Sequence, residues 1–344
     1  MSAVPVLVAM SGGVDSSVTA ALLKTQGYDV TGVTMKLWGG VQDSGCCSVS
    51  DVEDARRVAD QLEIPHHVFN FGDDFDEFVV QPYVEAHTRG QTPNPCIECN
   101  RHLKFDKLLR RATALGFDLV ATGHHARVVD TGSGLRVGRG ADTGKDQSYV
   151  LHMLTQEQLS RVVLPLGDMV KDDVRALATE LGLRTADKPD SQDVCFIAHT
   201  TGGRQNFLES RVELTPGQVV DGSGEVVGSV DAIELVTIGQ RKGLGVSGVV
   251  APLYATNVDV STATVTIGSR RDLVVERSPV RGLHWVGRAV HGEVDVQTSA
   301  HGSTSLGSIE DGEIVWAAPT SKVAPGQSVV FFENDLVVGS AIAD

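Results

Sequence analysis

The sequence of 344 residues is poor in cysteine and in aromatic residues. Its five cysteines are an odd number, which argues against a secreted disulfide framework and favours thiols that stay reduced until they are used. No apolar run approaches the roughly 18 residues of a membrane span, and the N-terminus lacks a basic stretch followed by an apolar signal core. We therefore expect a cytoplasmic protein with no membrane partner.

Basic residues are also scarce, because 29 lysines and arginines stand against 44 aspartates and glutamates and leave a formal net charge of −15. This balance disfavours a nucleic-acid partner, since phosphate binding needs clustered cations. Residues 86–145 differ: ten lysines and arginines against five acids give this segment +5, which leaves −20 for the remainder. The segment is either a basic RNA-binding face or a set of solvated helix faces.

The length and a hydrophobic content of 41% predict two or three domains with ordinary cores. Up to about residue 200, short apolar runs alternate with helical patterns, which predicts a doubly wound parallel sheet that binds its ligand at the carboxyl ends of the strands. We expect strands at 4–10, 28–38, 66–71 and 117–125. We expect helices starting near Asp15 or Ser16, over 50–63 with Ser50 or Asp51 as cap, over 101–116, and over 171–182.

Beyond about Thr200 the helical periodicity fades and short alternating runs appear at 235–239, 292–299, 312–318 and 327–334. These runs predict two small β-rich domains, and residues 269–279 read as the connector between them. We expect domain limits of 1–200, 201–272 for the central β-rich domain, and 273–344 for a C-terminal β-barrel-like domain.

The stretch "VPVLVAMSGGVDSSVTAALL" combines a buried strand, a Gly-Gly turn and a helix start. Unpaired N–H groups at a helix N-terminus form an anion site, most plausibly for phosphate. The Walker A lysine and the GxGxxG spacing are both missing. The motif S-G-G-x-D-S resembles instead the pyrophosphate loop of the ATP pyrophosphatase superfamily, whose members cleave ATP between its α and β phosphates. The plain alternative is a turn that only joins strand to helix.

Two cysteine motifs follow. "TPNPCIECNRHLKF" places Cys96 and Cys99 in a proline-constrained loop before a helix, and the helix N-terminus together with Arg101 and Lys104 should favour the Cys99 thiolate. "KPDSQDVCFIA" places Cys195 between a polar turn and a short apolar run. A lone cysteine is most often a buried structural residue.

Taken with "ATGHHAR", "KDQSYVLHML" and "GQRKGLG", these stretches occur in one order and at separations that resemble the MnmA family of bacterial tRNA-specific 2-thiouridylases. The resemblance covers almost the full chain and is strongest up to residue 245. It implies that residues 1–200 are an ATP pyrophosphatase catalytic domain. It also implies an ATP-dependent sulfurtransferase that adenylates the 2-carbonyl of the wobble uridine of tRNA and replaces that oxygen with persulfide sulfur.

The same resemblance implies roles for single residues. Cys195 receives a persulfide from a sulfur-relay protein, and Cys99 is the nucleophile that ends disulfide-linked to Cys195 until a reductant dithiol reduces the pair. Pyrophosphate is cradled by the loop from Ser11 to Ser17, and Asp15 helps to hold Mg²⁺. The ATP-binding positions are Ala9, Met10, Ser11, Gly12, Gly13, Val14, Asp15, Ser16, Met35 and Gly123. The tRNA-binding positions are Asn94, Pro95, Cys96, His124, Lys145, Asp146, Gln147 and Gln327.

Two departures and three alternatives stay open. Some family members have aspartate where this chain has Cys96, which leaves the general base unassigned, and "VQTSAHGS" lacks an arginine expected near tRNA. The Cys96–Cys99 pair with Cys46 and Cys47 would also suit a zinc-dependent or iron–sulfur-dependent sulfurtransferase. An amide-forming ligase would share the loop without needing Cys99 or Cys195. The third alternative is a tRNA-binding protein without catalytic activity.

Overall fold

The computed structural model describes residues 3–37, 48–190, 194–197, 202–247 and 251–344. The chain divides into two compact units, each made of separated segments. The first unit comprises residues 1–79, 95–198 and 334–337, and the second comprises 80–94, 199–333 and 338–344. No helix among the described residues is long and apolar enough to cross a membrane.

The first unit is built on a five-stranded sheet in the order β3-β2-β1-β4-β7, in which every neighbouring pair is parallel. The strand order runs outward from β1 on both sides, so the carboxyl ends of β1 and β4 form the topological switch point, where such sheets bind ligands. This confirms the predicted doubly wound α/β fold. The strands are β1 (Pro5–Ala9), β2 (Asp29–Lys36), β3 (His66–Asn70), β4 (Leu119–Ala121) and β7 (Val162–Val163).

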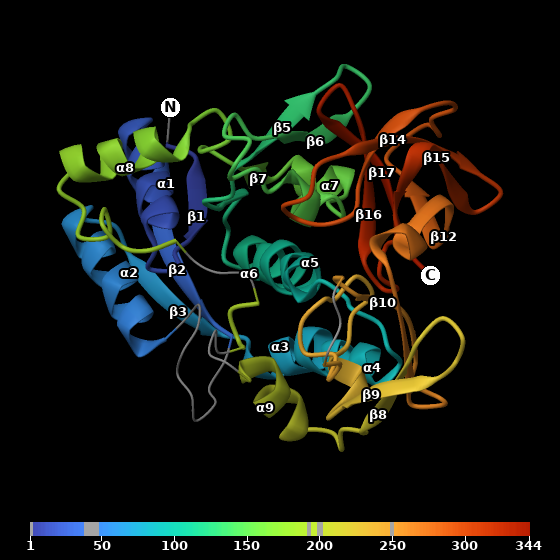
Figure 1. Cartoon of the computed structure of the whole chain (residues 1–344). Helices are drawn as coiled ribbons and strands as arrows, with labels where there is room; N and C mark the ends of the chain where they lie inside the picture. The colour runs from blue at the N-terminus through green and yellow to red at the C-terminus, as the bar shows by residue number, and fades with distance from the viewer. Residues whose placement is uncertain (1–2, 38–47, 191–193, 198–201, 248–250) are drawn as a thin grey trace. The chain divides into compact units, whose positions relative to one another are not determined.

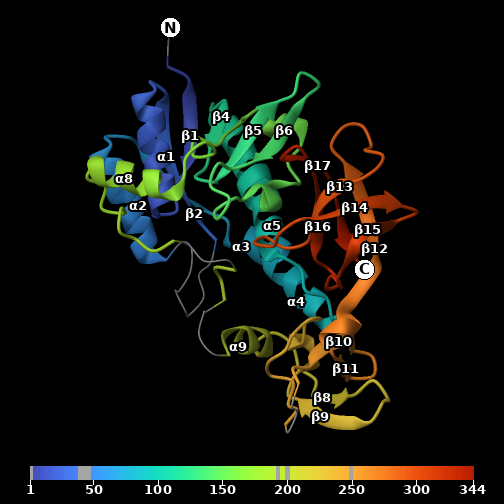
Figure 2. The ribbon, with the colours of Figure 1, turned by 45° about the horizontal axis from the view of Figure 1, so that its top comes forward.

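Three helices of the first unit share one apolar core with the sheet: α1 (Val14–Thr25), α2 (Val49–Gln61) and α8 (Lys171–Glu180). Val6 and Val8 of β1 belong to that core. Leu7 between them is fully buried and faces the other side of the sheet, because side chains alternate along a strand. Helices α1 and α8 lie side by side (Figures 1 and 2), and the Lys171 side chain at the start of α8 reaches Asp15 in the first turn of α1.

The cap of α2 corrects a prediction. The N-cap is Ser48, whose hydroxyl accepts a hydrogen bond from the Asp51 N–H at 3.2 Å. The Asp51 carboxylate accepts in turn from the Ser48 N–H, also at 3.2 Å. Ser50 is therefore not the cap, and Asp51 is the acidic partner in a capping box. The sequence pattern alone placed the cap two or three residues too late.

The cysteine segment is the second correction, because a helix begins where a loop was predicted. It runs through α5 (Pro95–Glu98), a π-helical stretch (Cys99–Lys107) and α6 (Leu108–Ala114). Proline is well suited to the first helical position, since its missing N–H would have no partner there, and this explains the early start. Cys96 and Cys99 are thus helical residues of the same segment.

Shorter elements complete the first unit, and a π-helical turn (Asp76–Val80) leads into the second. The hairpin of β5 and β6 was not anticipated from the sequence. These elements are α3 (Gly72–Phe75), β5 (Ala126–Asp130), β6 (Leu135–Arg139), a 3-10 turn (Ser148–Leu151) and α7 (Gln156–Leu159).

The second unit contains a small sheet in the order β10-β11-β8-β9 with its own apolar core. The predicted strand at 235–239 is absent from this sheet: a 3-10 turn (Ile233–Leu235) ends at its first residue, and the rest is loop and turn. The elements are α4 (Gln81–Thr88), α9 (Gly203–Glu209), β8 (Gly217–Val220), β9 (Val226–Val230), β10 (Tyr254–Asp259) and β11 (Thr264–Gly268).

A barrel forms the rest of the second unit. Its strand order is β12-β15-β14-β13-β16-β17, and β12 also pairs with β17, which closes the sheet. This confirms two β-rich parts after the parallel sheet. The predicted connector at 269–279 is a 3-10 turn (Arg270–Leu273) followed directly by β12. The strands are β12 (Val274–Trp285), β13 (Val294–Gln297), β14 (Ser305–Glu310), β15 (Glu313–Ser321), β16 (Ser328–Glu333) and β17 (Leu336–Ala343).

Candidate nucleotide and thiol site

Serine hydroxyl groups form hydrogen bonds across the loop between β1 and α1. The Ser16 hydroxyl accepts from the Ser11 N–H at 3.2 Å and donates to the Gly13 carbonyl at 3.1 Å. Gly13 is the N-cap of α1 and has no side chain with which to cap the helix. The first-turn N–H groups of α1 are therefore available to an anion, as predicted.

The position of Ser17 does not agree with the prediction that this residue also binds pyrophosphate. Its side chain is fully buried, and its hydroxyl donates to the Gly13 carbonyl at 2.8 Å. Its N–H is also used within the helix, since it donates to the same carbonyl at 3.2 Å. Ser17 thus stabilises the start of α1 from inside and does not face the open side of the loop.

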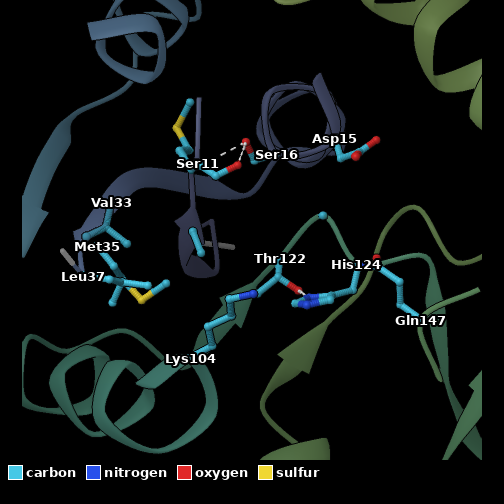
Figure 3. A pocket seen from close by; sticks show the side chains of 13 residues that line it. Ser11, Asp15, Ser16, Val33, Met35, Leu37, Lys104, Thr122, His124 and Gln147 are labelled. Carbon is cyan, nitrogen blue, oxygen red and sulfur yellow. Dashed lines mark hydrogen bonds between the residues drawn. The ribbon is translucent and has the colours of Figure 1, made fainter. Parts of the chain in front are cut away.

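A pocket opens beside this loop at the switch point of the sheet (Figure 3). Seven of the ten predicted ATP-binding residues line it, whereas Gly12, Gly13 and Val14 form the adjoining loop and helix start. Gly123 approaches α1 so closely that a Cβ atom there would lie 2.8 Å from the Asp15 carbonyl carbon. The thirteen lining residues are Ala9, Met10, Ser11, Asp15, Ser16, Val33, Met35, Leu37, Lys104, Thr122, Gly123, His124 and Gln147.

One side of the pocket is apolar. Val33, Met35 and Leu37 come from β2 and the residue after it, and Figure 3 shows them grouped away from Asp15 and Ser16. His124 lies in another part of the lining, where it is buried with Nδ1 at 2.6 Å from the Thr122 hydroxyl. Burial, followed by the nearby Lys104 charge, holds the pKa of His124 well below its usual range. The imidazole is therefore neutral at physiological pH. The apolar side chains of Val33, Met35 and Leu37 suit a flat, uncharged ring.

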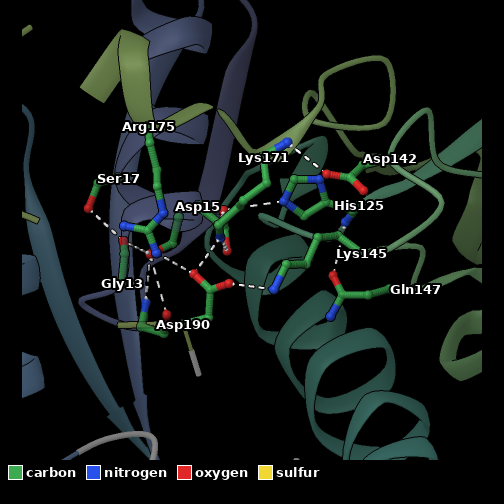
Figure 4. A network of polar contacts seen from close by, with 12 residues as sticks. Gly13, Asp15, Ser17, His125, Asp142, Lys145, Gln147, Lys171, Arg175 and Asp190 are labelled. Atoms are coloured by element: carbon green, nitrogen blue, oxygen red, sulfur yellow. Dashed lines mark hydrogen bonds and ion pairs between the residues drawn. The ribbon is translucent and has the colours of Figure 1, made fainter. Parts of the chain in front are cut away.

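Asp15, across the pocket from these apolar side chains, connects the pocket to a network of charges (Figure 4). The Lys171 ammonium lies 2.6 and 2.7 Å from the two Asp15 carboxylate oxygens and 3.0 Å from Asp190. Asp190 also accepts from Lys145 at 2.7 Å and from Arg175 at 2.6 Å. The Asp142 carboxylate accepts from the Lys171 N–H at 2.9 Å, which fixes the start of α8. Helix α8 thus carries its first side chain to the start of α1.

The ionisation of this network follows from its contacts. Burial opposes the charge on Asp15, but hydrogen bonds from His125 and Lys171 outweigh it and lower the pKa of that carboxyl. Burial also opposes the charge on Asp190, yet Lys145 and Lys171 hold the pKa of Asp190 far below its ordinary value. Both carboxylates are consequently ionised throughout the physiological pH range, each beside a lysine.

Lys188 ties the loop to α2. Its ammonium contacts the Gly12 carbonyl at 3.0 Å, Asp51 at 2.6 Å and Asp54 at 2.8 Å. Gly12 has a φ of +75°, and a Cβ atom there would overlap the Asp51 carbonyl group, so only glycine fits. The loop is held in place by this contact even without a ligand.

The two cysteine motifs meet in the first unit. The Val194 N–H lies 3.4 Å from the Cys96 Sγ, so the residue before Cys195 contacts the helix that bears Cys96 and Cys99. Cys99 is buried, whereas Cys96 and Cys195 are half-buried. Cys99 opens the π-helical stretch, a distortion that often marks functional positions. Next to Cys195, Phe196 packs edge-to-face on Phe75 at 5.4 Å between ring centroids.

The predicted tRNA-binding residues are dispersed. His124 and Gln147 line the pocket, and the Gln147 side-chain oxygen accepts from the His125 N–H at 2.9 Å. Asp146 is used internally, because it pairs with Arg139 at 2.9 Å and its side chain is only 8% exposed. Pro95 and Cys96 begin α5. Asn94 belongs to the second unit, as does Gln327, whose amide donates to the Thr92 carbonyl.

The basic segment 86–145 is largely neutralised by its own contacts. Seven of its ten cations form ion pairs with acids, namely Arg89, Arg101, Lys107, Arg110, Arg127, Arg139 and Lys145. Lys104 lines the nucleotide pocket, and Arg111 lies over the Phe69 ring. The excess charge counted in the sequence therefore does not amount to an open basic face.

The residues available to a metal ion are few. Among the described residues, no group of three His, Cys, Asp or Glu side chains could hold one. Cys46 and Cys47, which a cluster would need, lie outside the described residues. Asp15 stands at the pocket as a single carboxylate, which fits Mg²⁺, an ion commonly bound through one or two carboxylates and the phosphates of its substrate.

The sequence reasoning missed Lys171, Asp190, His125, Asp142 and Lys188. Lys171 is separated from Asp15 by 156 residues, so no local pattern joins them. Two signals were nevertheless present. The first is the polar "KPDSQD" before Cys195, which holds Lys188 and Asp190, and the second is the lysine that opens the helix in "KDDVR".

The parallel sheet, the anion loop and the two-sided pocket define an α/β nucleotide-binding protein. The family model described as "tRNA methyl transferase HUP domain" matches residues 4–199. Two further models match the rest of the chain: "tRNA methyl transferase PRC-barrel domain" at 205–269 and "Aminomethyltransferase beta-barrel domain" at 280–343.

Similar proteins name the family more closely. The tRNA-specific 2-thiouridylase MnmA of Mycolicibacterium smegmatis is 46% identical over 98% of this chain and 98% of its own length. That of Heliobacterium modesticaldum is 46% identical over 97% of this chain and 91% of its own length. The solved U34-tRNA thiolase NcsA from Methanococcus maripaludis aligns at 18% identity over 61% of this chain and 66% of that chain, with a TM-score of 0.37. The chain belongs to the tRNA-specific 2-thiouridylase family.

Proposed function

We propose that the chain uses ATP to replace the 2-carbonyl oxygen of the wobble uridine of tRNA with sulfur. Membership of the 2-thiouridylase family makes it a tRNA-uridine sulfurtransferase. The observation that supports this particular chemistry is the meeting of the two cysteine motifs within the unit that carries the nucleotide pocket. Expected domain limits of 1–200, 201–272 and 273–344 remain part of the proposal, as does the cytoplasmic location.

The first step is activation of the uridine. Its 2-carbonyl oxygen attacks the α phosphorus of ATP, the bond to the β phosphate breaks, and pyrophosphate leaves with its negative charges. In this proposal the N-terminus of α1 and the ammonium groups of Lys171 and Lys145, which now pair with Asp15 and Asp190, stabilise those charges. Mg²⁺, held by Asp15, would supply further charge neutralisation to the phosphates. The apolar side of the pocket, with Met35, would receive the adenine ring.

The second step is sulfur transfer. A persulfide on Cys195, delivered by a sulfur-relay protein, attacks C2 of the activated uridine with its terminal sulfur, and AMP leaves. The Cys99 thiolate attacks the Cys195 Sγ, which breaks the persulfide bond and forms a Cys99–Cys195 disulfide. A dithiol reductant must then restore both thiols. Helical placement of Cys99, one turn after Cys96, puts it on the segment that Val194 contacts.

The test separates the two steps. Cys99→Ala and Cys195→Ala should both lose 2-thiouridine, measured by mass spectrometry of tRNA nucleosides. Both should still catalyse tRNA-dependent ATP–pyrophosphate exchange, because the ATP site contains neither thiol. After one turnover without reductant, peptide mapping of the wild type should show the Cys99–Cys195 disulfide.

Cys96→Ala is the matched control, since it removes a thiol one turn away. It should keep at least partial thiolation. If Cys96→Ala abolishes thiolation as fully as Cys99→Ala, or if the trapped disulfide contains Cys96, then the nucleophile is assigned to the wrong thiol.

A further inference from the structure

Two adjacent pairs of cations in the second unit have no role in the chemistry above. They are Arg241 and Lys242, in the "GQRKGLG" motif, and Arg270 and Arg271, in the 3-10 turn after β11. All four residues are exposed. Among the described residues, no acid forms an ion pair with any of the four. We call these four residues the cationic patch.

The two pairs lie at the same end of the small sheet. Ala255, near the start of β10, donates to the Gln240 carbonyl at 2.9 Å and accepts from the Gly239 N–H at 2.8 Å. Tyr254, one residue earlier, is paired with Gly268 at the end of β11. Arg241 directly follows Gln240, which is hydrogen-bonded to β10 near its start. Arg270 lies two residues after Gly268, the end of β11 that pairs with the start of β10.

The loop that carries Arg241 and Lys242 is built as a fixed structure. The Gln240 side chain accepts from the Thr237 N–H at 3.1 Å and donates to the Lys242 carbonyl at 2.9 Å. Leu244 is buried in the apolar core of this sheet. A Cβ atom at Gly245 would overlap the Ser229 carbonyl oxygen, so the loop returns tightly against β9. The backbone that carries the two cations is thus held in place, so a ligand would not have to order the loop.

Nearby acid does not neutralise the patch. Asp272 is the adjacent acid in sequence, and its carboxylate accepts from the Ser269 N–H at 2.7 Å and the Ser269 hydroxyl at 2.8 Å. That carboxylate caps the turn. The arrangement contrasts with residues 86–145, where most cations are ion-paired. On a chain of net charge −15, cations that form no ion pair with an acid and stand on an ordered backbone are the part of the described surface suited to a polyanion.

We propose that the cationic patch binds phosphate groups of the tRNA backbone. The inference rests on the proposed function for its choice of polyanion, since the family's substrate is an RNA that an acidic protein must hold by local charge. Arginine pairs with phosphate through two parallel N–H donors, and lysine does so as a point charge. The patch contributes affinity that depends on salt and not on base sequence.

The experiment measures tRNA binding as a function of salt for R241Q/K242Q and R270Q/R271Q. Each double variant should weaken binding several-fold or more at low salt. Each should also reduce the log–log salt slope by roughly 0.7 to 0.9 for every phosphate group that the variant no longer binds. At saturating tRNA, ATP–pyrophosphate exchange should keep its wild-type rate, so that only the KM for tRNA rises. The charge-preserving variant R241K/K242R should bind much as the wild type does, which separates the effect of charge from that of a damaged loop.

The matched control is R56Q/R57Q, which removes an adjacent exposed pair from α2 in the first unit and changes net charge equally. Unchanged affinity and slope in both patch variants, or equal loss in the control, would overturn the proposal. It would also be overturned if tRNA binding were intact while sulfur delivery from a protein donor was weakened, because the patch would then bind protein. The proposed reaction and the proposed patch can fail separately. If the wild type forms no 2-thiouridine but the patch variants still bind tRNA more weakly, the proposed reaction is refuted and the tRNA-binding role of the patch is supported.

Discussion

The two sides of the nucleotide pocket offer a ligand different interactions, because one side is charged and the other is apolar. On one side, Asp15, Lys171 and Asp190 form a chain of ionised groups at distances of 2.6 to 3.0 Å. On the other, Val33, Met35 and Leu37 form a buried or nearly buried apolar group. The charged side can reorganise its ion pairs around phosphates, whereas the apolar side can only accept a ring that fits. We therefore expect substitutions on the charged side to change the rate, and those on the apolar side to change ATP affinity.

The largest effect should come from Lys171→Met. It leaves Asp15 without its shortest ion pair and removes a cation from the phosphate side. We expect tRNA-dependent ATP–pyrophosphate exchange to fall about 100-fold or more, as is typical when a positioned charge-stabilising group is removed. Arg184→Gln is the control, because it breaks an ion pair with Asp54 whose arginine is 46% exposed, and it should stay within about twofold. If Lys171→Met kept the wild-type exchange rate, Lys171 would have no role in stabilising the phosphate charges.

A smaller effect is expected from Met35→Ala on the apolar side. Truncation removes buried apolar surface that would face the ring and should raise the KM for ATP by roughly tenfold, for about 1.4 kcal/mol of reduced burial. The rate at saturating ATP should hardly change. Met35→Leu, which keeps most of the volume, should behave nearly as the wild type does. The comparison between the two sides fails if Met35→Ala lowers the saturated rate as strongly as Lys171→Met does.

The smallest effect concerns acid stability. The pKa of His124 is far below its unfolded value of about 6.5, so between those values the unfolded chain binds a proton that the folded chain does not. The contribution of His124 to the free energy of unfolding is therefore fully present above about pH 6.5. It decreases as the pH drops below that value, by at most about 1.4 kcal/mol per pH unit. Asp15 and Asp190 have lowered pKa values, so their contribution is lost only below about pH 4.

Denaturant unfolding at several pH values between about 7.5 and 5 checks this. His124→Gln should lose less stability than the wild type over this interval. His87, buried in the second unit with its pKa lowered chiefly by burial to about 4, should contribute in the same direction in both proteins. Equal pH dependence of the wild type and His124→Gln would show that His124 is not buried in its neutral form.

How far the sequence predicted the site depended on whether the interacting residues are near each other in the chain. Ser11, Asp15 and Ser16 were found because one strand–turn–helix motif contains all three. Lys171 and Asp190 were not, because only the folding of α8 and the following turn against α1 brings them to Asp15. The alternation of strands and helices up to about residue 200 followed from the apolar patterns, since these reflect burial directly.

Boundaries and side-chain pairing were less predictable. Ser48 caps α2 where Ser50 and Asp51 were equally plausible from composition, and the choice depends on backbone geometry. The charge count over residues 86–145 suggested a basic face, but it could not show that Glu85, Asp74 and Asp168, outside the segment, pair with its cations. Net charge in a segment is a property of the sequence, whereas exposed charge depends on tertiary contacts.

The central claim is that the charged side of the pocket supports cleavage of ATP between its α and β phosphates for adenylation of tRNA. The most direct measurement follows ATP labelled at the α phosphate, and in a parallel reaction ATP labelled at the γ phosphate, during thiolation of tRNA with Mg²⁺ and a persulfide donor present. The α label reports AMP or ADP and the γ label reports pyrophosphate or inorganic phosphate, both separated by chromatography and counted against 2-thiouridine from nucleoside mass spectrometry. The account predicts one AMP and one pyrophosphate for each 2-thiouridine formed, and neither product without tRNA. Formation of ADP and inorganic phosphate, or of 2-thiouridine without AMP, would contradict it.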